Sequence, residues 1–378
     1  MKDFCYNVFA SLDIQPNGNL RPCCKFLNSE IPEQFNIRDG ISKYKESAWL
    51  KDLQRQFIAG EKPKGCSRCW KEEDAGIKSM RQMDIEKHRK EFESLRIGET
   101  KFVKVQLDFG NICNLACRIC GPGASSRWAS EQHKEDGKTY PIHDWFKDKN
   151  IMQDLSQSTK NAVHIDIGGG EPLIVDITEH FEYLQHFVDS GRSREISLHY
   201  NTNGTTFPKP DHIDIWKQFK KVDLQLSIDD TGKRFEYNRW PANWKKVYAN
   251  IKKYQKLCND NKHFVLSVSF SVSAFTIFYA EDFFKWCIKE GLPAPWMGVI
   301  VNPSYYNPQV LPQDAKETSD ALPQATSPKQ PEMTYSGERK LVGIATMHKS
   351  NQVPVFADKD DTSGRKKATE ITMMKGNK

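Results

Sequence analysis

The sequence predicts an α/β fold, in which a small cysteine-rich segment precedes a parallel sheet that is open or curled into a partial barrel. Three observations support this prediction. Strand-like and helix-like segments alternate over about 200 residues, one late strand alternates apolar residues with serines, and eight of the ten cysteines fall in the first third of the chain. Single strands that alternate with helices are typical of βαβ units, whose strands run parallel.

The alternating region contains six predicted strands. They are expected at residues 102–108, 163–167, 195–200, 222–228, 264–273 and 296–301. Helices are expected at residues 177–189, 212–220, 244–257 and 281–290, and polar-rich helical sequence follows the first strand to about residue 156. The helix at 244–257 repeats its apolar residues with a period of 3.6, which places them on one face.

The strand at 264–273 indicates what one face of the sheet meets. Its apolar residues alternate at a period of two with Ser267, Ser269, Ser271 and Ser273. A parallel strand covered on both faces reads as almost continuously apolar. The serines therefore predict a polar barrel interior, and a solvent-facing edge strand is the alternative.

The composition allows a sizeable core. The chain has 378 residues, 38% of them hydrophobic, with a formal net charge of +6. This mild charge gives no reason to expect nucleic-acid binding. No apolar run reaches the roughly 20 residues that a membrane span needs. The first residues also lack the apolar core of a signal peptide. We therefore expect a cytoplasmic protein without membrane contact.

Three parts of the chain are expected. Residues 1–95 form a cysteine-rich domain, residues 96–307 form the α/β barrel, and residues 308–378 form a Pro-rich linker with a weakly ordered basic tail. In a reducing compartment, cysteines serve more often as metal ligands than as disulfides.

Three cysteines lie close together directly after the first strand of the barrel. Cys113, Cys117 and Cys120 occupy the carboxyl end of that strand, which is where α/β sheets and barrels hold their active sites. Three thiolates can bind three irons of a [4Fe–4S] cluster and leave the fourth iron to another ligand. A structural zinc site needs a fourth ligand, and none lies at the usual spacing. The spacing therefore favours an iron–sulfur cluster.

The C-x3-C-x2-C spacing, together with the motifs that follow it, resembles the radical S-adenosylmethionine (SAM) enzymes. Gly-Gly-Glu-Pro follows the second strand, Asn-Thr-Asn-Gly ends the third, Ser-Ile-Asp ends the fourth, and an arginine comes shortly after. Singly, these are ordinary turn or capping sequences. Their order at the ends of successive strands favours a cofactor site.

The resemblance covers about residues 102–301 and implies a SAM-binding site. In relatives, the Gly-Gly-Glu motif binds the SAM amino group, and the later positions contact its ribose and carboxylate. The residues implied here are Gly169, Gly170, Glu171, Pro172, Asn201, Asn203, Ser227, Asp229 and Arg239. One position departs from the family, because Ile119 stands where an aromatic residue often contacts adenine.

The N-terminal cysteines form a second set. A predicted hairpin with a Pro-Asn-Gly turn lies between Cys5 and the pair Cys23-Cys24, and Cys66 and Cys69 follow at C-x2-C spacing. This arrangement resembles the SPASM/twitch auxiliary-cluster domains of radical SAM enzymes. In this chain, however, it precedes the barrel, and residue 75, where a later cysteine of a full SPASM module would fall, is alanine. The resemblance implies a second [4Fe–4S] cluster on Cys5, Cys23, Cys66 and Cys69. A zinc ribbon is the alternative, and Cys24 could replace Cys23.

The resemblance implies an oxidoreductase or transferase. By this resemblance, an iron–sulfur cluster on Cys113, Cys117 and Cys120 would cleave SAM reductively, and the resulting 5′-deoxyadenosyl radical would abstract a hydrogen from the substrate. The protein then orients SAM and excludes water. An electron donor such as flavodoxin or ferredoxin is expected. The substrate is a peptide or a small molecule, with a sugar or nucleotide as one alternative. A non-catalytic zinc-binding protein is an alternative of another class.

Overall fold

The computed structural model describes residues 4–32, 34–93, 99–174, 178–301 and 303–315. The chain divides into two compact units, one that ends at Ser269 and one that begins at Phe270. Beyond residue 315, the predicted linker and tail lie outside the described residues, as does residue 177 at the start of a predicted helix.

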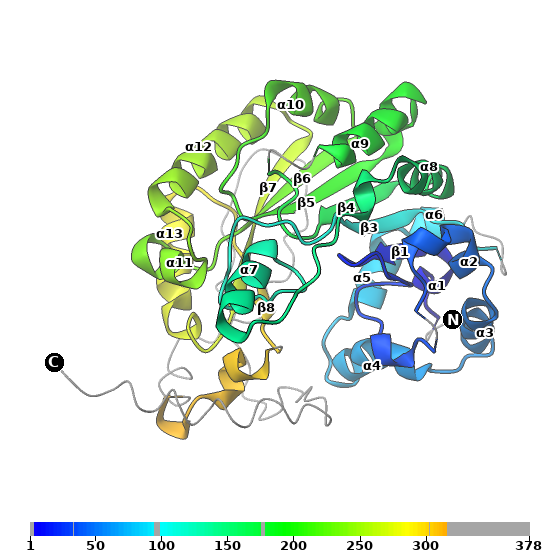
Figure 1. The fold of residues 1–378 in the computed structure, drawn as a ribbon, viewed down its shortest axis with the longest axis horizontal. Helices are drawn as coiled ribbons and strands as arrows, with labels where there is room; N and C mark the ends of the chain where they lie inside the picture. The colour runs from blue at the N-terminus through cyan, green and yellow to red at the C-terminus, as the bar shows by residue number, and fades with distance from the viewer. Residues whose placement is uncertain (1–3, 33, 94–98, 175–177, 302, 316–378) are drawn as a thin grey trace. The chain divides into compact units, whose positions relative to one another are not determined.

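One mostly parallel sheet organises the fold (Figure 1). Its strands are β1 (Ser11–Ile14), β2 (Leu20–Arg21), β3 (Lys104–Asp108), β4 (His164–Gly168), β5 (Ser197–Thr202), β6 (Lys221–Ser227), β7 (Phe264–Val272) and β8 (Trp296–Val299). They lie in the order β2-β1-β3-β4-β5-β6-β7-β8. Neighbours from β1 to β7 pair in parallel, and β2 pairs antiparallel with β1. The six predicted strands correspond in order to β3–β8, so the predicted α/β class is confirmed.

Helices connect the strands. The N-terminal segment contains α1 (Asn7–Ala10), α2 (Ile41–Lys45), α3 (Ala48–Ile58), α4 (Ser67–Asp74), α5 (Met80–Lys87) and α6 (Arg89–Glu93). Between β3 and β7 lie α7 (Ser126–Asp136), α8 (Lys149–Ser158), α9 (Glu179–Asp189), α10 (Pro210–Trp216), α11 (Gly232–Asn238) and α12 (Trp244–Asp260). The second unit contains α13 (Ala280–Lys289). In Figure 1, α9, α10 and α12 lie along the outer side of the strands.

Helices cover the outer face of the sheet, and the side chains on that face are apolar. On β6, Val222, Leu224 and Leu226 are fully buried, and they alternate with half-exposed polar residues. Tyr200 on β5 packs against Trp216 of α10, with ring centroids 4.8 Å apart. The alternation along each strand therefore separates a packed outer face from a polar inner face.

The inner face is polar across several strands. Strand register places Gln106, Asp166, His199 and Asp223 side by side. The ring of His199 lies 3.3 Å from the Asp223 carboxylate, and the Ser267 hydroxyl donates to that carboxylate at 2.8 Å. The serine side of β7 thus lies on a polar face, as the sequence pattern predicts.

The N-terminal segment continues the same sheet. β1 pairs in parallel with β3, from Ser11 opposite Lys104 to Ile14 opposite Leu107. The predicted hairpin is present as β1 and β2. Its turn sequence could not show that β1 also pairs with the barrel sheet. That pairing depends on contacts between residues almost 100 positions apart.

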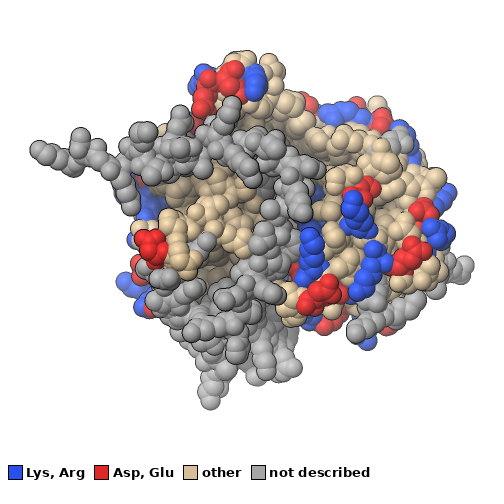
Figure 2. All heavy atoms as spheres, turned by 90° about the horizontal axis from the view of Figure 1, so that it is seen from below, with Lys and Arg blue, Asp and Glu red and all other residues tan. Residues whose placement is uncertain are grey.

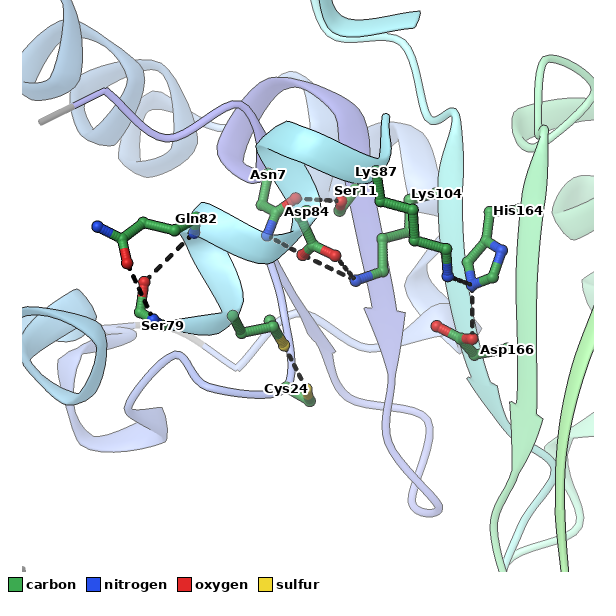
Figure 3. A network of polar contacts seen from close by, with 11 residues as sticks. Asn7, Ser11, Cys24, Ser79, Gln82, Asp84, Lys87, Lys104, His164 and Asp166 are labelled. Atoms are coloured by element: carbon green, nitrogen blue, oxygen red, sulfur yellow. Dashed lines mark hydrogen bonds and ion pairs between the residues drawn. The ribbon is translucent and has the colours of Figure 1, made fainter. Parts of the chain in front are cut away.

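Helix α5 is held to the strands by a polar network (Figure 3). The Asp84 carboxylate accepts hydrogen bonds from Lys104 on β3 and from Asn7, each at 2.8 Å. Lys87 lies 3.3 Å from the ring of His164 on β4, and that ring contacts Asp166. Burial opposes the charge of Lys104, but Asp84 outweighs it, so the pKa of Lys104 is raised. The N-terminal segment is therefore joined to the barrel strands by charged groups as well as by main chain.

Charged side chains of both signs are mixed on one face of the molecule. Figure 2 shows lysine and arginine next to aspartate and glutamate on the face that it presents. This distribution matches the mild net charge of the chain.

Candidate functional site

A loop between β3 and α7 carries the three closely spaced cysteines. Asn111, which is fully buried, holds the loop: its amide nitrogen donates to Pro122 and Pro141, and its oxygen accepts from the main chain of His143. The indole of Trp128 on α7 donates to the Cys117 carbonyl at 2.6 Å. Sequence reasoning missed both residues, although Asn111 stands only two positions before the first cysteine.

Burial raises the pKa of all three thiols on the loop. Burial raises the pKa of Cys113 to about 11 and that of Cys117 to about 12, and the neighbouring thiols contribute to both shifts. Burial also raises the pKa of Cys120. Metal ligation requires thiolates, so binding of a metal group here would release protons. Three half-buried thiols on one anchored loop fit a cluster that leaves one iron for a non-protein ligand.

The glycines after β4 pack against the cysteine loop. The main-chain nitrogens of Gly170 and Glu171 donate to the carbonyls of Gly110 and Ile112, at 3.1 and 2.9 Å. A Cβ atom on Gly170 would overlap the Ile112 carbonyl. Gly169 has φ +110°, a conformation that favours glycine. Close approach to this loop is thus one physical reason for the glycines.

Glu171 is turned into the protein. Its side chain accepts hydrogen bonds from the Thr202 hydroxyl at 2.7 Å and from the main-chain nitrogens of Asn203 at 2.6 Å and Leu173 at 3.1 Å. Burial raises its pKa despite these bonds. The carboxylate therefore holds the end of β5, and the ammonium-binding role implied by the resemblance stays a prediction. The neighbouring Pro172 is also buried.

The end of β5 also contacts the cysteine loop. The Asn203 amide donates at 3.0 Å to Asn114, which lies between Cys113 and Cys117, and Asn114 donates to the Thr205 hydroxyl at 2.9 Å. Sequence reasoning missed Asn114, Thr202 and Thr205, which no spacing rule distinguishes from ordinary turn residues. Asn201 is exposed, and Ser227 at the end of β6 and Ile119 on the loop are half-buried.

Asp229 and Arg239 form a buried ion pair beside the loop. Arg239 Nη2 lies 2.7 Å from Asp229 Oδ2, and Arg239 Nη1 lies 3.9 Å from Cys117 Sγ. The three groups therefore form a chain from the end of β6 to one of the predicted cluster ligands.

Four of the five N-terminal thiols converge. Cys5, Cys23, Cys66 and Cys69 line one small pocket together with Asn7, Lys25, Phe26, Met80 and Arg81. Cys24 is not among the lining residues, and its sulfur contacts Met80 Sδ at 3.5 Å. Burial raises the pKa of Cys5 to about 12, and Arg81 acts in the opposite direction.

Two findings concern the described part of the chain as a whole. No group of three or more His, Cys, Asp or Glu side chains there is arranged around the position of a single metal ion. Its helices are also too short or too polar to cross a membrane.

Comparison with known proteins identifies one family. Residues 107–270 match the Radical SAM superfamily. A search of the curated proteins found no significant match.

Solved structures to which the chain is similar include two of anSMEcpe and one of SuiB. The structure of anSMEcpe with bound AdoMet is 16% identical, covers 52% of each chain and has a TM-score of 0.38. With AdoMet and the Kp18Cys peptide, the values are 17% identity, 53% of this chain, 51% of that chain and a TM-score of 0.39. Streptococcus suis SuiB bound to S-adenosylmethionine is 14% identical over 81% of this chain and 64% of that chain, with a TM-score of 0.37. The chain spans about half the length of anSMEcpe.

The matched region begins within β3 and ends within β7, so it contains the three-cysteine loop, the Gly-Gly-Glu segment and the strand ends that contact the loop. Residues 107–270 are therefore the part of the chain that is similar to the Radical SAM superfamily.

Proposed function

We propose that this protein is a radical SAM enzyme, which holds a [4Fe–4S] cluster on Cys113, Cys117 and Cys120 and binds SAM beside it. The chemistry that such a cluster supplies is the reductive cleavage of SAM to methionine and a 5′-deoxyadenosyl radical, which takes a hydrogen atom from the substrate. The single observation that carries the proposal is the three-thiol loop, held in place by the ends of three successive parallel strands.

Each of these strand ends supports a different part of the loop. After β4, Gly170 and Glu171 donate to loop carbonyls. After β5, Asn203 contacts the loop through Asn114. After β6, the segment that contains Arg239 pairs with the residues around Cys117. These contacts hold the loop that carries the proposed ligands, and such anchoring would reduce the ordering that cluster binding requires.

We further propose that SAM lies along the same strand ends. Asn201 and Ser227 end neighbouring strands and keep exposed surface, so they are available to a polar ligand. Gly169, Gly170, Glu171, Pro172 and Asn203 would shape the methionine end, and Asp229 and Arg239 would lie close to the SAM carboxylate and ribose.

The substrate is proposed to be polar. The inner face carries Gln106, Asp166, His199, Asp223 and Ser267 at neighbouring positions. Several of these groups already pair with protein partners, and a polar ligand would add hydrogen bonds to this face that an apolar ligand would not. A peptide with polar side chains fits this face, and a sugar or nucleotide is the alternative. We expect a flavodoxin or ferredoxin to supply the electron.

The N-terminal thiols are proposed to hold a second [4Fe–4S] cluster in a twitch-like domain. The support is the pocket that Cys5, Cys23, Cys66 and Cys69 line together, whereas Cys24 is not among its lining residues. Zinc is the alternative occupant of four thiolates. All ten cysteines are free thiols, which agrees with a proposed reducing, cytoplasmic location.

Metal analysis and SAM cleavage test both sites. The anaerobically reconstituted protein should contain about eight irons, four for each cluster, and should release 5′-deoxyadenosine with dithionite. Cys113→Ala should abolish that release. Cys66→Ala with Cys69→Ala should halve the iron and retain slow SAM cleavage.

Cys258→Ala is the matched control, because this half-buried thiol on α12 belongs to neither set. It should change neither iron content nor cleavage. Retained cleavage in Cys113→Ala refutes the radical SAM site. About four irons with one zinc in the parent protein would refute the second cluster alone.

A further inference from the structure

Two segments far apart in sequence pair beside the cysteine loop. The main-chain nitrogen of Ala116 donates to the Trp240 carbonyl at 2.6 Å, and that of Arg118 donates to the Asn238 carbonyl at 2.8 Å. These bonds lie on either side of Cys117 and Arg239. The backbone therefore places these two residues opposite each other.

The Arg239 side chain completes the contact. Its Nη1 atom lies 3.9 Å from Cys117 Sγ, within hydrogen-bond distance for a sulfur acceptor. On the other side, its Nη2 atom lies 2.7 Å from Asp229 Oδ2. The Arg239 side chain is 9% exposed and the Asp229 side chain 2% exposed, so water screens neither charge well.

The guanidinium has a defined orientation. Asp229 holds one nitrogen, while another nitrogen faces the thiol. Arginine keeps its charge in proteins and only donates hydrogen bonds. The ion pair therefore directs its positive end toward Cys117 and its negative end away.

We infer that Arg239, held by Asp229, is a positioning residue that raises the reduction potential of the cluster through Cys117. This inference rests on the proposed cluster at Cys113, Cys117 and Cys120. A ligating cysteine is a thiolate. A hydrogen bond and a positive charge beside it stabilise the reduced cluster, which carries one more negative charge, more than the oxidised cluster.

This role differs from contact with SAM and can be measured without it. The cluster is titrated in the full-length chain with redox mediators, in the absence of SAM, and the reduced form is followed by electron paramagnetic resonance. The Cys66→Ala, Cys69→Ala background limits the signal to one cluster. A residue that acted only on bound SAM would leave this titration unchanged.

Arg239→Gln removes the charge and keeps a hydrogen-bonding side chain. At a fixed solution potential, the ratio of reduced to oxidised cluster should fall about tenfold, which corresponds to about 59 mV for a one-electron couple. Arg239→Lys keeps the charge on a different head group. Its ratio of reduced to oxidised cluster should lie between those of Arg239→Gln and the parent. Asp229→Asn removes the opposing negative charge and should shift the ratio in the other direction.

The opposite signs separate electrostatics from structural damage, because both changes disturb the same ion pair. An unchanged ratio in Arg239→Gln, or shifts of the same sign in Arg239→Gln and Asp229→Asn, would overturn the inference. Iron content and the visible absorption spectrum confirm that each variant holds its cluster. If Arg239→Gln assembles none, Arg239→Lys and Asp229→Asn carry the test. A background protein without any cluster signal would instead refute the proposed function.

Discussion

Replacement of Glu171 distinguishes two roles for the Gly-Gly-Glu segment. Glu171 is only 1% exposed, and its carboxylate accepts hydrogen bonds from Thr202, Asn203 and Leu173. If the carboxylate holds the end of β5, its loss should weaken the folded protein even without cofactors. If it serves only SAM, its loss should affect SAM binding alone.

The expected cost follows from the donors that lose their acceptor. In Glu171→Ala, the main-chain nitrogens of Asn203 and Leu173 stay buried without that partner, at about 1–3 kcal/mol each. The Thr202 hydroxyl can rotate to another acceptor and adds little. Release of a buried carboxylate offsets part of the total, so we expect a loss of about 3 kcal/mol in the free energy of unfolding.

Urea unfolding of the metal-free protein measures this cost, and calorimetric titration of the reconstituted protein measures SAM affinity. Glu171→Gln keeps one acceptor oxygen and should cost about half as much as Glu171→Ala. Thr202→Val removes one hydroxyl donor and should cost about 1 kcal/mol. A Glu171→Ala variant as stable as the parent, with weaker SAM binding, would refute the loop-holding role.

Three further predictions concern two ion pairs of the fold and the packing of a glycine against the cysteine loop. Asp84→Asn should cost about 3 kcal/mol in unfolding free energy because it leaves Lys104 buried without its carboxylate; Asp84→Asn with Lys104→Met should cost less, and a larger loss in the double variant would contradict this. Burial opposes a higher pKa at His199, but its hydrogen bond to a β6 carboxylate outweighs burial, so the folded-state pKa lies above the unfolded value of about 6.5. The resulting stabilisation is complete below that unfolded value and disappears as pH rises through the folded value; His199→Gln should therefore cost more in urea unfolding near pH 6 than near pH 9, and equal costs would speak against the pair. Gly170→Ala should lose iron on gel filtration because the new Cβ overlaps a carbonyl of the cysteine loop, whereas Gly123→Ala, which meets open space, should retain it.

The sequence alone was sufficient for features that depend on local spacing. The alternation of β6, from Lys221 to Ser227, follows from the two-residue period of a strand with one covered face. The apolar period of α12 predicts its buried face. The spacing of Cys113, Cys117 and Cys120 likewise belongs to one short loop. Each of these patterns is complete within a few turns of chain.

Only the tertiary structure decided which groups meet across the strand ends. The orientation of Glu171 toward Thr202, the contact of Arg239 with Cys117 and the pairing of β1 with β3 each join segments separated by about 30 to 120 residues. Cys23 and Cys24 are identical in type and adjacent in sequence, so only the surrounding fold could decide that Cys23 lines the thiol pocket and Cys24 does not. Local sequence sets where a strand ends and what it carries. The direction and partner of each side chain depend on sheet register and loop packing, which are properties of the whole fold.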